Sequence, residues 1–209
     1  MKLVYGTTNN AKVHFMKRRV EPLGIEILSL SDVCAPKLNI AESGSNPLEN
    51  AKIKALAYYN ELKLPVFSCD SGLYIEGLDE ARQPGVNIRG KDDYMDDDEA
   101  VRYYSALAAE LGGSMTARYK NAIVLVLDEK TVCEYMGEDI ASEPFRIVSK
   151  PHKNGVVAKG FLLDCLSIQI ESDKYYYDIE GYIDKYLNVH DGFAAFFRRT
   201  LGLEKREFV

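Results

Sequence analysis

Short apolar runs alternate along the first half of the chain with segments in which apolar side chains recur every three to four positions. Residues 3–5 and 25–30 are short β-prone runs, which predicts two strands. Between them, Val13, Met16 and Val20 recur at helical spacing. The order expected at the N-terminus is therefore strand, polar loop, helix and strand.

The same pattern predicts further helices and strands. Asn46, Pro47 and Glu49 are typical of an N-cap, a first-turn proline and a capping-box acid, so we expect a helix from there to about Lys63. The acidic run 96–99 is expected to begin a helix that ends before two glycines. The remaining expected strands are at 116–127, 131–135 and 145–148 and within 156–170, and further helices are expected at 181–187 and 193–201. Residues 175–177 are expected to form an edge strand or a lid surface.

The apolar runs within residues 66–75 meet at Asp70, Ser71 and Gly72. We expect Asp70 to lie at the end of a buried strand, where ligands of α/β proteins bind. A plain turn between two strands is the alternative, because Asp, Ser and Gly all favour turns. In both cases the alternation of strands and helices predicts an α/β fold.

The composition is that of an ordinary globular protein. A chain of 209 residues with 46% hydrophobic content can bury a core as one domain or as two closely joined lobes. No apolar run approaches the ~20 residues that cross a bilayer, and the first strand begins too early for a signal peptide, so we expect a cytoplasmic protein without a membrane partner. The scattered cysteines predict buried, reduced thiols rather than disulfides or a zinc site. They are Cys34, Cys69, Cys133 and Cys165.

The formal net charge of -6 argues against a nucleic-acid polymer as partner, because neutralising many phosphates requires a basic face. A small anion is still possible in the loop after the first strand, which offers polar groups at a helix N-terminus and a lysine in the first turn. The loop lacks the spacing of a Walker motif, and a simple helix-capping loop is an equal alternative. The candidate phosphate contacts are Thr7, Thr8, Asn9, Asn10 and Lys12.

Three further charged residues occupy positions that a phosphate or a metal ion can use. Glu42 lies in the loop before the helix expected at 47–63 and can bend inward. Lys54 lies one and a half turns along that helix, where a solvated lysine is the alternative. Arg89 follows a proline-glycine turn and can hold a phosphate through two hydrogen bonds, although a surface turn explains it as well.

Three stretches taken together carry a resemblance to a known family. They are Thr7-x-Asn9-x-x-Lys12, then Glu42-Ser43-Gly44 followed by Glu49-Asn50-Ala51-x-x-Lys54-Ala55, and then Asp70-Ser71-Gly72-Leu73 with Pro84-Gly85-Val86 and Arg89. Their order and spacing over residues 1–127 resemble those of the Ham1-like family, the inosine/xanthosine triphosphate pyrophosphatases.

The resemblance implies an α/β fold of the ITPase-like, or Maf-Ham1, type: an elongated mixed β-sheet with flanking helices. Residues 1–209 would form a single domain whose two lobes enclose a nucleotide cleft, usually as a homodimer. The implied reaction is Mg²⁺-dependent hydrolysis of a nucleoside triphosphate to a monophosphate and pyrophosphate. By position, Glu42 and Asp70 resemble the metal carboxylates, and Asp70 also the base for the attacking water. Lys12, Lys54 and Ser71 resemble triphosphate contacts.

Two acids suffice for Mg²⁺, which is typically bound by one or two carboxylates together with substrate phosphates. The sequence departs from the family at Cys69, which replaces the first of two consecutive acids, and at Leu162 and Leu163 within a Gly-Phe-Gly-Tyr-Asp-Pro motif. The substrate contacts that the resemblance implies in the last third are Phe161, Asp164, Lys185, His190 and Asp191.

Asp191 stands where the family has an arginine, and an ionised aspartate accepts hydrogen bonds that an arginine donates. We therefore hypothesise a shift of selectivity towards bases with amino groups, unless Asp191 only caps the closing helix. A Maf-like nucleotide pyrophosphatase and a catalytically degenerate nucleotide-binding protein are the alternatives.

Overall fold

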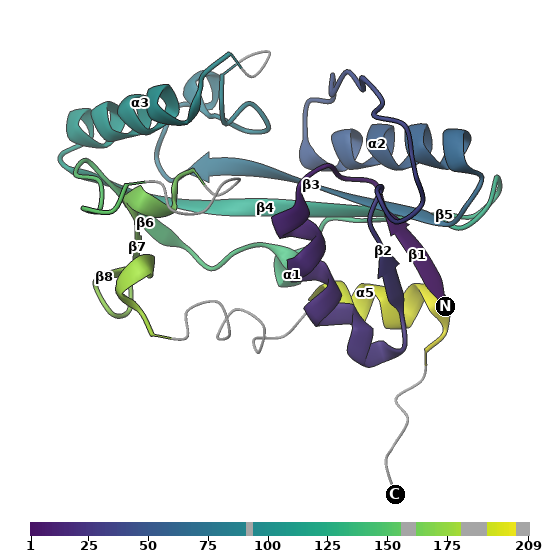
Figure 1. Cartoon of the computed structure of the whole chain (residues 1–209). Coiled ribbons are helices and arrows are strands. Elements are labelled where there is room, and N and C mark those ends of the chain that lie inside the picture. The colour runs from purple at the N-terminus through teal and green to yellow at the C-terminus, as the bar shows by residue number, and fades with distance from the viewer. Residues whose placement is uncertain (91–93, 156–161, 181–191, 204–209) are drawn as a thin grey trace, which may run out of the picture. The chain divides into compact units, whose positions relative to one another are not determined.

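The computed structural model has a mixed β-sheet flanked by helices (Figure 1). It describes residues 1–90, 94–155, 162–180 and 192–203. Hydrogen bonds join the strands in the order β2-β1-β3-β4-β6-β7-β8, and β5 pairs with β4. The predicted α/β class with a mixed sheet is confirmed. The strands are β1 (Lys2–Tyr5), β2 (Glu26–Leu28), β3 (Val66–Ile75), β4 (Ser114–Val126), β5 (Val132–Tyr135), β6 (Phe145–Val148), β7 (Ser167–Gln169) and β8 (Lys174–Tyr175).

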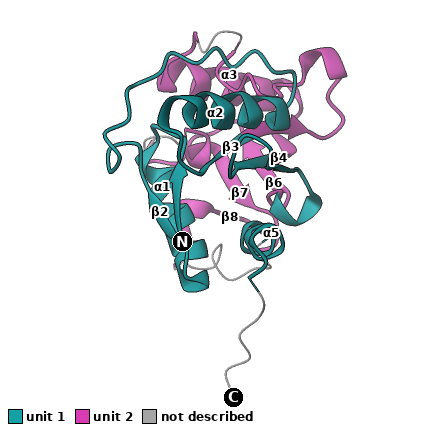
Figure 2. Cartoon of the chain, turned by 90° about the vertical axis from the view of Figure 1, so that its right-hand side faces the viewer, with its two compact units in different colours: residues 1–70, 121–140, 187–209 teal, residues 71–120, 141–186 magenta. Residues whose placement is uncertain are grey.

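The chain divides into two compact units, which Figure 2 shows in different colours. Unit 1 comprises residues 1–70, 121–140 and 187–209, and unit 2 comprises residues 71–120 and 141–186. β3 and β4 each contribute residues to both units. A nucleotide cleft between two lobes stays a prediction.

In unit 1, helices cover both faces of the sheet. β1 pairs in parallel with β2 and β3, and the second half of β4 pairs with β5 in antiparallel fashion. Helix α2 (Pro47–Leu62) lies on one face, and helices α1 (Asn10–Val20) and α5 (Gly192–Leu201) lie on the other (Figure 1). Because successive strand residues point to opposite faces, Val66 packs with α2 while Phe67 packs with α1 and α5.

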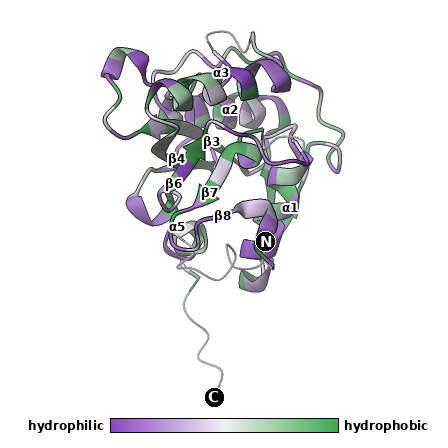
Figure 3. Ribbon diagram, turned by 90° about the vertical axis from the view of Figure 1, so that its left-hand side faces the viewer, coloured by the Kyte–Doolittle hydropathy of each residue, from purple (hydrophilic) through white to green (hydrophobic). Residues whose placement is uncertain are grey.

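In unit 2, helix α3 (Asp97–Glu110) packs on antiparallel strands. The first half of β4 pairs with β6, β6 with β7, and β7 with β8. One buried cluster joins Tyr104 and Leu107 of α3 to Phe145 and Ile147 of β6. Figure 3 shows both hydrophilic and hydrophobic residues along α3, as expected for a helix with one buried face.

The helix starts predicted from local patterns are confirmed. The Asn46 side chain accepts a hydrogen bond from the backbone N–H of Glu49, and α2 ends at Leu62, with Lys63 as its C-cap in the left-handed conformation. Asp96 and Glu99 form a capping box at the start of α3. These contacts join residues three apart, so the sequence pattern alone is enough to predict them.

The predictions around Asp70 were wrong in one respect. β3 runs unbroken from Val66 to Ile75, so Asp70 lies within a strand, neither at its end nor in a turn. The reason is a contact with a distant segment: Leu73 and Gly85 form an isolated antiparallel bridge. A Cβ atom on Gly72 would lie 3.1 Å from both the carbonyl carbon and the oxygen of Gly85. Gly72 therefore allows a close backbone approach and does not turn the chain.

Several expected strands are shorter than predicted. The one expected at 25–30 is only Glu26–Leu28, and the one within 156–170 is β7. The expected edge strand at 175–177 stops at Tyr175 because a 3₁₀ turn, Tyr176–Asp178, brings the buried Tyr176 side chain into the core of unit 2. The helix expected at 181–187 lies outside the described residues.

Candidate functional site

The loop between β1 and α1 is organised by helix capping. The Asn9 side chain accepts hydrogen bonds from the backbone N–H groups of Ala11 and Lys12, at 3.0 and 3.2 Å. The Thr7 hydroxyl oxygen accepts one from the N–H of Asn9 at 3.2 Å. Asn9 is therefore the N-cap of α1, as the capping alternative predicted. Thr8 is exposed on the loop, and Asn10 is exposed as the first residue of α1. Capping places Lys12 in the first turn of α1.

The loop before α2 is folded tightly against the start of that helix. The buried Asn50 side chain accepts a hydrogen bond from the N–H of Gly44 at 2.8 Å. A Cβ atom on Gly44 would lie 2.7 Å from the same Asn50 Oδ1. Glu49 accepts hydrogen bonds from the N–H and hydroxyl of Ser45, so it has a structural role. Its partner is Ser45 and not the backbone N–H of the N-cap Asn46, which a capping box would use. The loop is thereby fixed two residues after Glu42.

Asn50 is a positioning residue to which the sequence patterns assigned no role. It is 3% exposed on a helix face that also buries Ala51 and Ala55. A polar side chain on the buried face of a helix requires a hydrogen-bond partner. An asparagine at such a position in the sequence pattern is therefore the signal that identifies Asn50.

Lys54 joins Glu42 and Asp70. Its ammonium Nζ lies 2.6 Å from Asp70 Oδ1 and 2.8 Å from Glu42 Oε2. The side chains of Lys54 and Asp70 are 14% and 11% exposed, whereas that of Glu42 is 43% exposed. Burial lowers the pKa of Lys54, but attraction by Asp70 and then Glu42 outweighs it, so the net pKa is raised. Lys54 is not the solvated lysine of the alternative reading.

Lys12 belongs to the same electrostatic cluster. Burial lowers its pKa, and so does repulsion by the Lys54 ammonium. Attraction by Asp70, and more weakly by Cys69 and Glu42, does not compensate. The structure thus brings Lys12, Glu42, Lys54 and Asp70 together within unit 1, from three helix and loop segments and one strand.

Replacing Lys12 by Met should stabilise the fold at pH 7. The ammonium is disfavoured in the folded state, so its cost is present below the folded pKa and disappears as the pH rises towards the ordinary value of 10.5. We expect a gain of roughly 0.5–2 kcal/mol at pH 7, the range of single stabilising substitutions. Denaturant unfolding at pH 7 and near pH 10 measures it. An equal or larger gain at the higher pH would contradict the prediction.

Cys69 packs next to the cluster as a neutral thiol. It precedes Asp70 in β3, is 8% exposed and shares a hydrogen bond with the hydroxyl of Tyr5. Burial is the main cause that raises the pKa of the thiol to about 12, although the bond to Tyr5 and the nearby lysines lower it. Cys69 therefore carries no negative charge at neutral pH and offers Mg²⁺ no hard ligand.

The cysteines should differ sharply in their reaction with a thiol reagent. Cys34 is exposed and Cys133 half-buried, whereas Cys69 and Cys165 are buried and burial raises the pKa of both thiols. Because the thiolate is the reacting form, we expect Cys34 to react first and the buried pair only after unfolding. Timed alkylation with peptide mapping tests this, and rapid labelling of Cys69 in the folded protein would contradict it.

The cluster fits a hard divalent cation. Two carboxylates, Glu42 and Asp70, already converge on one positive group, the ammonium of Lys54. In the described part of the chain, no group of three or more His, Cys, Asp or Glu residues could hold a metal ion. Two carboxylate ligands are within the range of one or two that Mg²⁺ takes when substrate phosphates and water complete its shell.

Two further predicted phosphate contacts, Ser71 and Arg89, lie in unit 2. Ser71 follows Asp70 in β3 and is half-buried. The guanidinium of Arg89 forms an ion pair with Asp97 and donates to the carbonyl oxygen of Met95 at 3.1 Å. Arg89 therefore holds the start of α3, as the surface-turn alternative allows, and its role as a phosphate contact stays a prediction.

Of the substrate contacts expected in the last third of the chain, only Asp164 is described. It is half-buried at the start of a 3₁₀ turn in unit 2, and burial raises the pKa of its carboxyl group to about 7. The two leucines before it, Leu162 and Leu163, are 8% and 1% exposed and pack in the core of unit 2. Phe161, Lys185, His190 and Asp191 lie outside the described residues.

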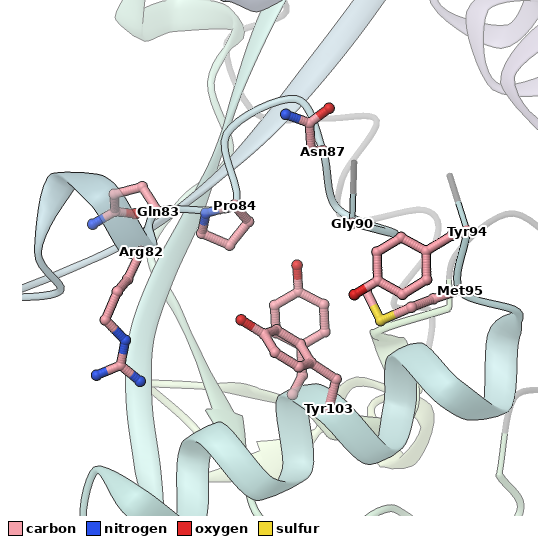
Figure 4. A pocket seen from close by; sticks show the side chains of 9 residues that line it. Arg82, Gln83, Pro84, Asn87, Gly90, Tyr94, Met95 and Tyr103 are labelled. Atoms are coloured by element: carbon pink, nitrogen blue, oxygen red, sulfur yellow. The ribbon is translucent and has the colours of Figure 1, made fainter. Parts of the chain in front are cut away.

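A separate pocket of about 200 Å³ opens in unit 2 (Figure 4). Several of its polar side chains already have partners: Gln83 bonds to the backbone of Ile75 and Leu78, and Tyr104 donates to Ile88. Of the residues in the motifs quoted from the sequence, Pro84 lines this pocket, and none of the predicted site residues does. It is lined by Arg82, Gln83, Pro84, Asn87, Gly90, Tyr94, Met95, Tyr103 and Tyr104.

The chain is similar in sequence to proteins of one known family. The Ham1 family model matches residues 3–146. A dITP/XTP pyrophosphatase of Aquifex aeolicus is 41% identical over 86 residues, which are 41% of this chain and 40% of that protein. One of Rhodopseudomonas palustris is 36% identical over 121 residues, 56% of this chain and 54% of that protein. The matches thus span well under two thirds of these relatives.

Solved structures share the fold over nearly the whole chain. A HAM1 protein from Coxiella burnetii has a TM-score of 0.69 at 22% identity, with 97% of this chain and 98% of that one covered. The Ham1 protein of Staphylococcus aureus has a TM-score of 0.67 at 18% identity and covers 99% and 100%. Likeness at this level of identity establishes the fold, and the fold alone.

Proposed function

The chain belongs to the Ham1 family, and from that premise we propose that it is a nucleoside triphosphate pyrophosphatase. Its substrates would be deaminated purine nucleotides such as ITP, dITP and XTP, and its products a nucleoside monophosphate and pyrophosphate. The names of the relatives support this substrate class. The observation that carries the proposal is the meeting of Lys12, Lys54, Glu42 and Asp70.

Lys12 is the residue best suited to bind the triphosphate. Lys54 already holds two carboxylates, which raises its pKa, whereas the pKa of Lys12 is lowered by burial and by the Lys54 charge. Lys12 is therefore a half-buried cation whose charge the protein compensates only partly. A polyphosphate supplies the missing negative charge, and the N-terminus of α1 favours the same anion.

Asp70 is the proposed base. In hydrolysis between the α- and β-phosphates, the attacking water loses a proton while the bridging oxygen leaves with pyrophosphate. Asp70 Oδ1 is fixed by Lys54, and its carboxylate can take up that proton. When bound, Mg²⁺ would be held by Glu42 and Asp70 and would neutralise charge on the phosphates. Lys12 and Lys54 orient the phosphates and offset the charge that develops during cleavage.

The preferred nucleobase of the substrate is a separate part of the proposal. Leu162 and Leu163 are buried in the core of unit 2, so they are packing residues and not candidates for base contacts. The hypothesis of a shift towards amino-bearing bases rests on Asp191. The names of the relatives favour deaminated purines over a Maf-like activity.

Pyrophosphate release across a panel of nucleotides tests the proposal. The panel contains ITP, dITP, XTP, ATP, GTP and the pyrimidine triphosphates, each with Mg²⁺ present and with Mg²⁺ chelated. We expect release from the deaminated purines with Mg²⁺ only. Turnover mainly of pyrimidine nucleotides would favour the Maf-like alternative, and no turnover of any nucleotide would favour a binding protein without catalysis.

We also propose that the protein acts as a cytoplasmic homodimer, as its family resemblance implies. In the residues that the structure describes, no helix is long and apolar enough to span a membrane. Light scattering coupled to size exclusion measures the mass directly, and a mass equal to that of one 23.5 kDa chain would reject the dimer.

A further inference from the structure

One ammonium group stands where two carboxylates converge. Lys54 on α2 bonds to Glu42 in the preceding loop and to Asp70 in β3, at 2.8 and 2.6 Å. These partners are 12 and 16 residues away along the chain, so the contact is made by the fold. Lys54 and Asp70 are largely buried, which shields this pair from solvent more than a surface ion pair.

The carboxylates of Glu42 and Asp70 both lie within 2.8 Å of the same nitrogen atom, Lys54 Nζ. Two negative charges that converge in this way repel each other unless a cation lies between them. Lys54 supplies a single positive charge, which leaves the trio of Glu42, Lys54 and Asp70 with one net negative charge. A divalent cation bound by the same oxygens would stand next to the ammonium and be repelled by it.

We infer that Lys54 is an internal counter-cation that occupies the proposed metal position in the nucleotide-free protein and competes with a divalent ion for Glu42 and Asp70. This inference rests on the proposed function, which assigns the two carboxylates to the metal. A divalent ion then binds by displacing the ammonium, and Lys54 is released towards the triphosphate. Metal and nucleotide therefore bind more tightly together than either does alone.

The packing of α2 determines which groups can move when a divalent ion displaces the Lys54 ammonium. Ala51, Ala55 and Tyr58 of α2 are buried against the sheet, so the helix backbone on both sides of Lys54 is held. The long lysine side chain can change rotamer without moving the helix. Glu42, on an exposed loop position, can follow the ion more easily than Asp70, which is fixed in a strand.

The first test is Mn²⁺ binding without nucleotide, measured by the EPR signal of the free ion. The variant Lys54→Met keeps an unbranched side chain only one heavy atom shorter and removes its charge. We expect it to bind Mn²⁺ at least about tenfold more tightly than the wild type, since repulsion between unit charges near a protein surface corresponds to one or more powers of ten in affinity. Unchanged or weaker binding by a folded Lys54→Met protein would overturn the inference.

Lys52→Met is the matched control. Lys52 lies on the same helix, but its ammonium pairs with Glu134 at 2.7 Å and touches neither carboxylate. We expect its Mn²⁺ affinity to equal that of the wild type. Adding Glu42→Gln to Lys54→Met should reverse the gain. If it does not, the ion binds elsewhere, and both the inference and the proposed metal site fail.

A measurement on the wild type covers the case in which Lys54→Met does not fold. Acylation of lysines with peptide mapping should show that Mg²⁺ raises the reaction rate of Lys54 several-fold, because the displaced ammonium loses its carboxylate partners. The rate of Lys52 should stay constant. A Lys54 rate that Mg²⁺ leaves unchanged, in a protein whose pyrophosphatase activity requires Mg²⁺, would overturn the competition and leave the proposed function intact.

Discussion

Replacing Asp70 by Asn should lower the kcat/KM for ITP by roughly 10²–10⁴-fold, the contribution typical of a positioned acid or base. Asparagine has nearly the same size but takes up no proton and carries no negative charge. It also leaves the Lys54 ammonium with Glu42 as its single carboxylate partner. Steady-state pyrophosphate release with saturating Mg²⁺ measures the loss.

Cys69→Ser is the matched control for this variant. Cys69 is the adjacent residue in β3, and a serine hydroxyl can replace the thiol in the hydrogen bond with Tyr5. Since the neutral thiol is assigned neither a charge nor a ligand role, activity should stay within about threefold of the wild type, a change near 0.6 kcal/mol. Equal losses in the two variants would show that disturbance of β3, and not the carboxylate, is responsible.

Local patterns were sufficient for the helix starts and for the alternation of elements. The N-caps at Asn46 and Asp96 depend on hydrogen bonds to residues three positions further along, so the pattern and the contact are the same residues. The apolar run at 122–126 likewise became the buried half of β4. The helix caps follow from spacing because no distant partner is involved, whereas the β4 run was recognisable because a strand buried on both faces is continuously apolar.

Features that depend on distant segments were not predictable in the same way. The contact of Gly72 with Gly85 turned an expected strand end into a continuous strand. The ion pairs of Lys54 reach into a loop and a strand, and a helical position alone does not distinguish such a lysine from a solvated one. The resemblance to a family singled out Lys12, Glu42, Lys54 and Asp70, but only the fold reveals which cation and which acids are neighbours.

Gly44→Ala should lower the kcat/KM for ITP by roughly 10–100-fold, the effect usual when a residue that orients a metal ligand is disturbed. The added Cβ atom would lie 2.6 Å from the Cβ of Glu49 and 2.9 Å from the backbone nitrogen of Asn50. Carbon atoms prefer separations of about 3.5–4.0 Å, so something must move. Because α2 is packed against the sheet, the loop will move, and Glu42 lies two residues before the substitution.

The change in the free energy of unfolding of Gly44→Ala should distinguish displacement of the loop from loss of the fold. Movement of the loop breaks the hydrogen bond from the Gly44 N–H to the buried Asn50 side chain, which costs about 1–3 kcal/mol and leaves the cores of both units unchanged. The control Ser43→Ala changes an exposed neighbour on the same loop and should keep both activity and stability. Full activity in Gly44→Ala would mean that Glu42 needs no fixed loop. The ion pair with Lys54 alone would then be enough to hold its carboxylate in place.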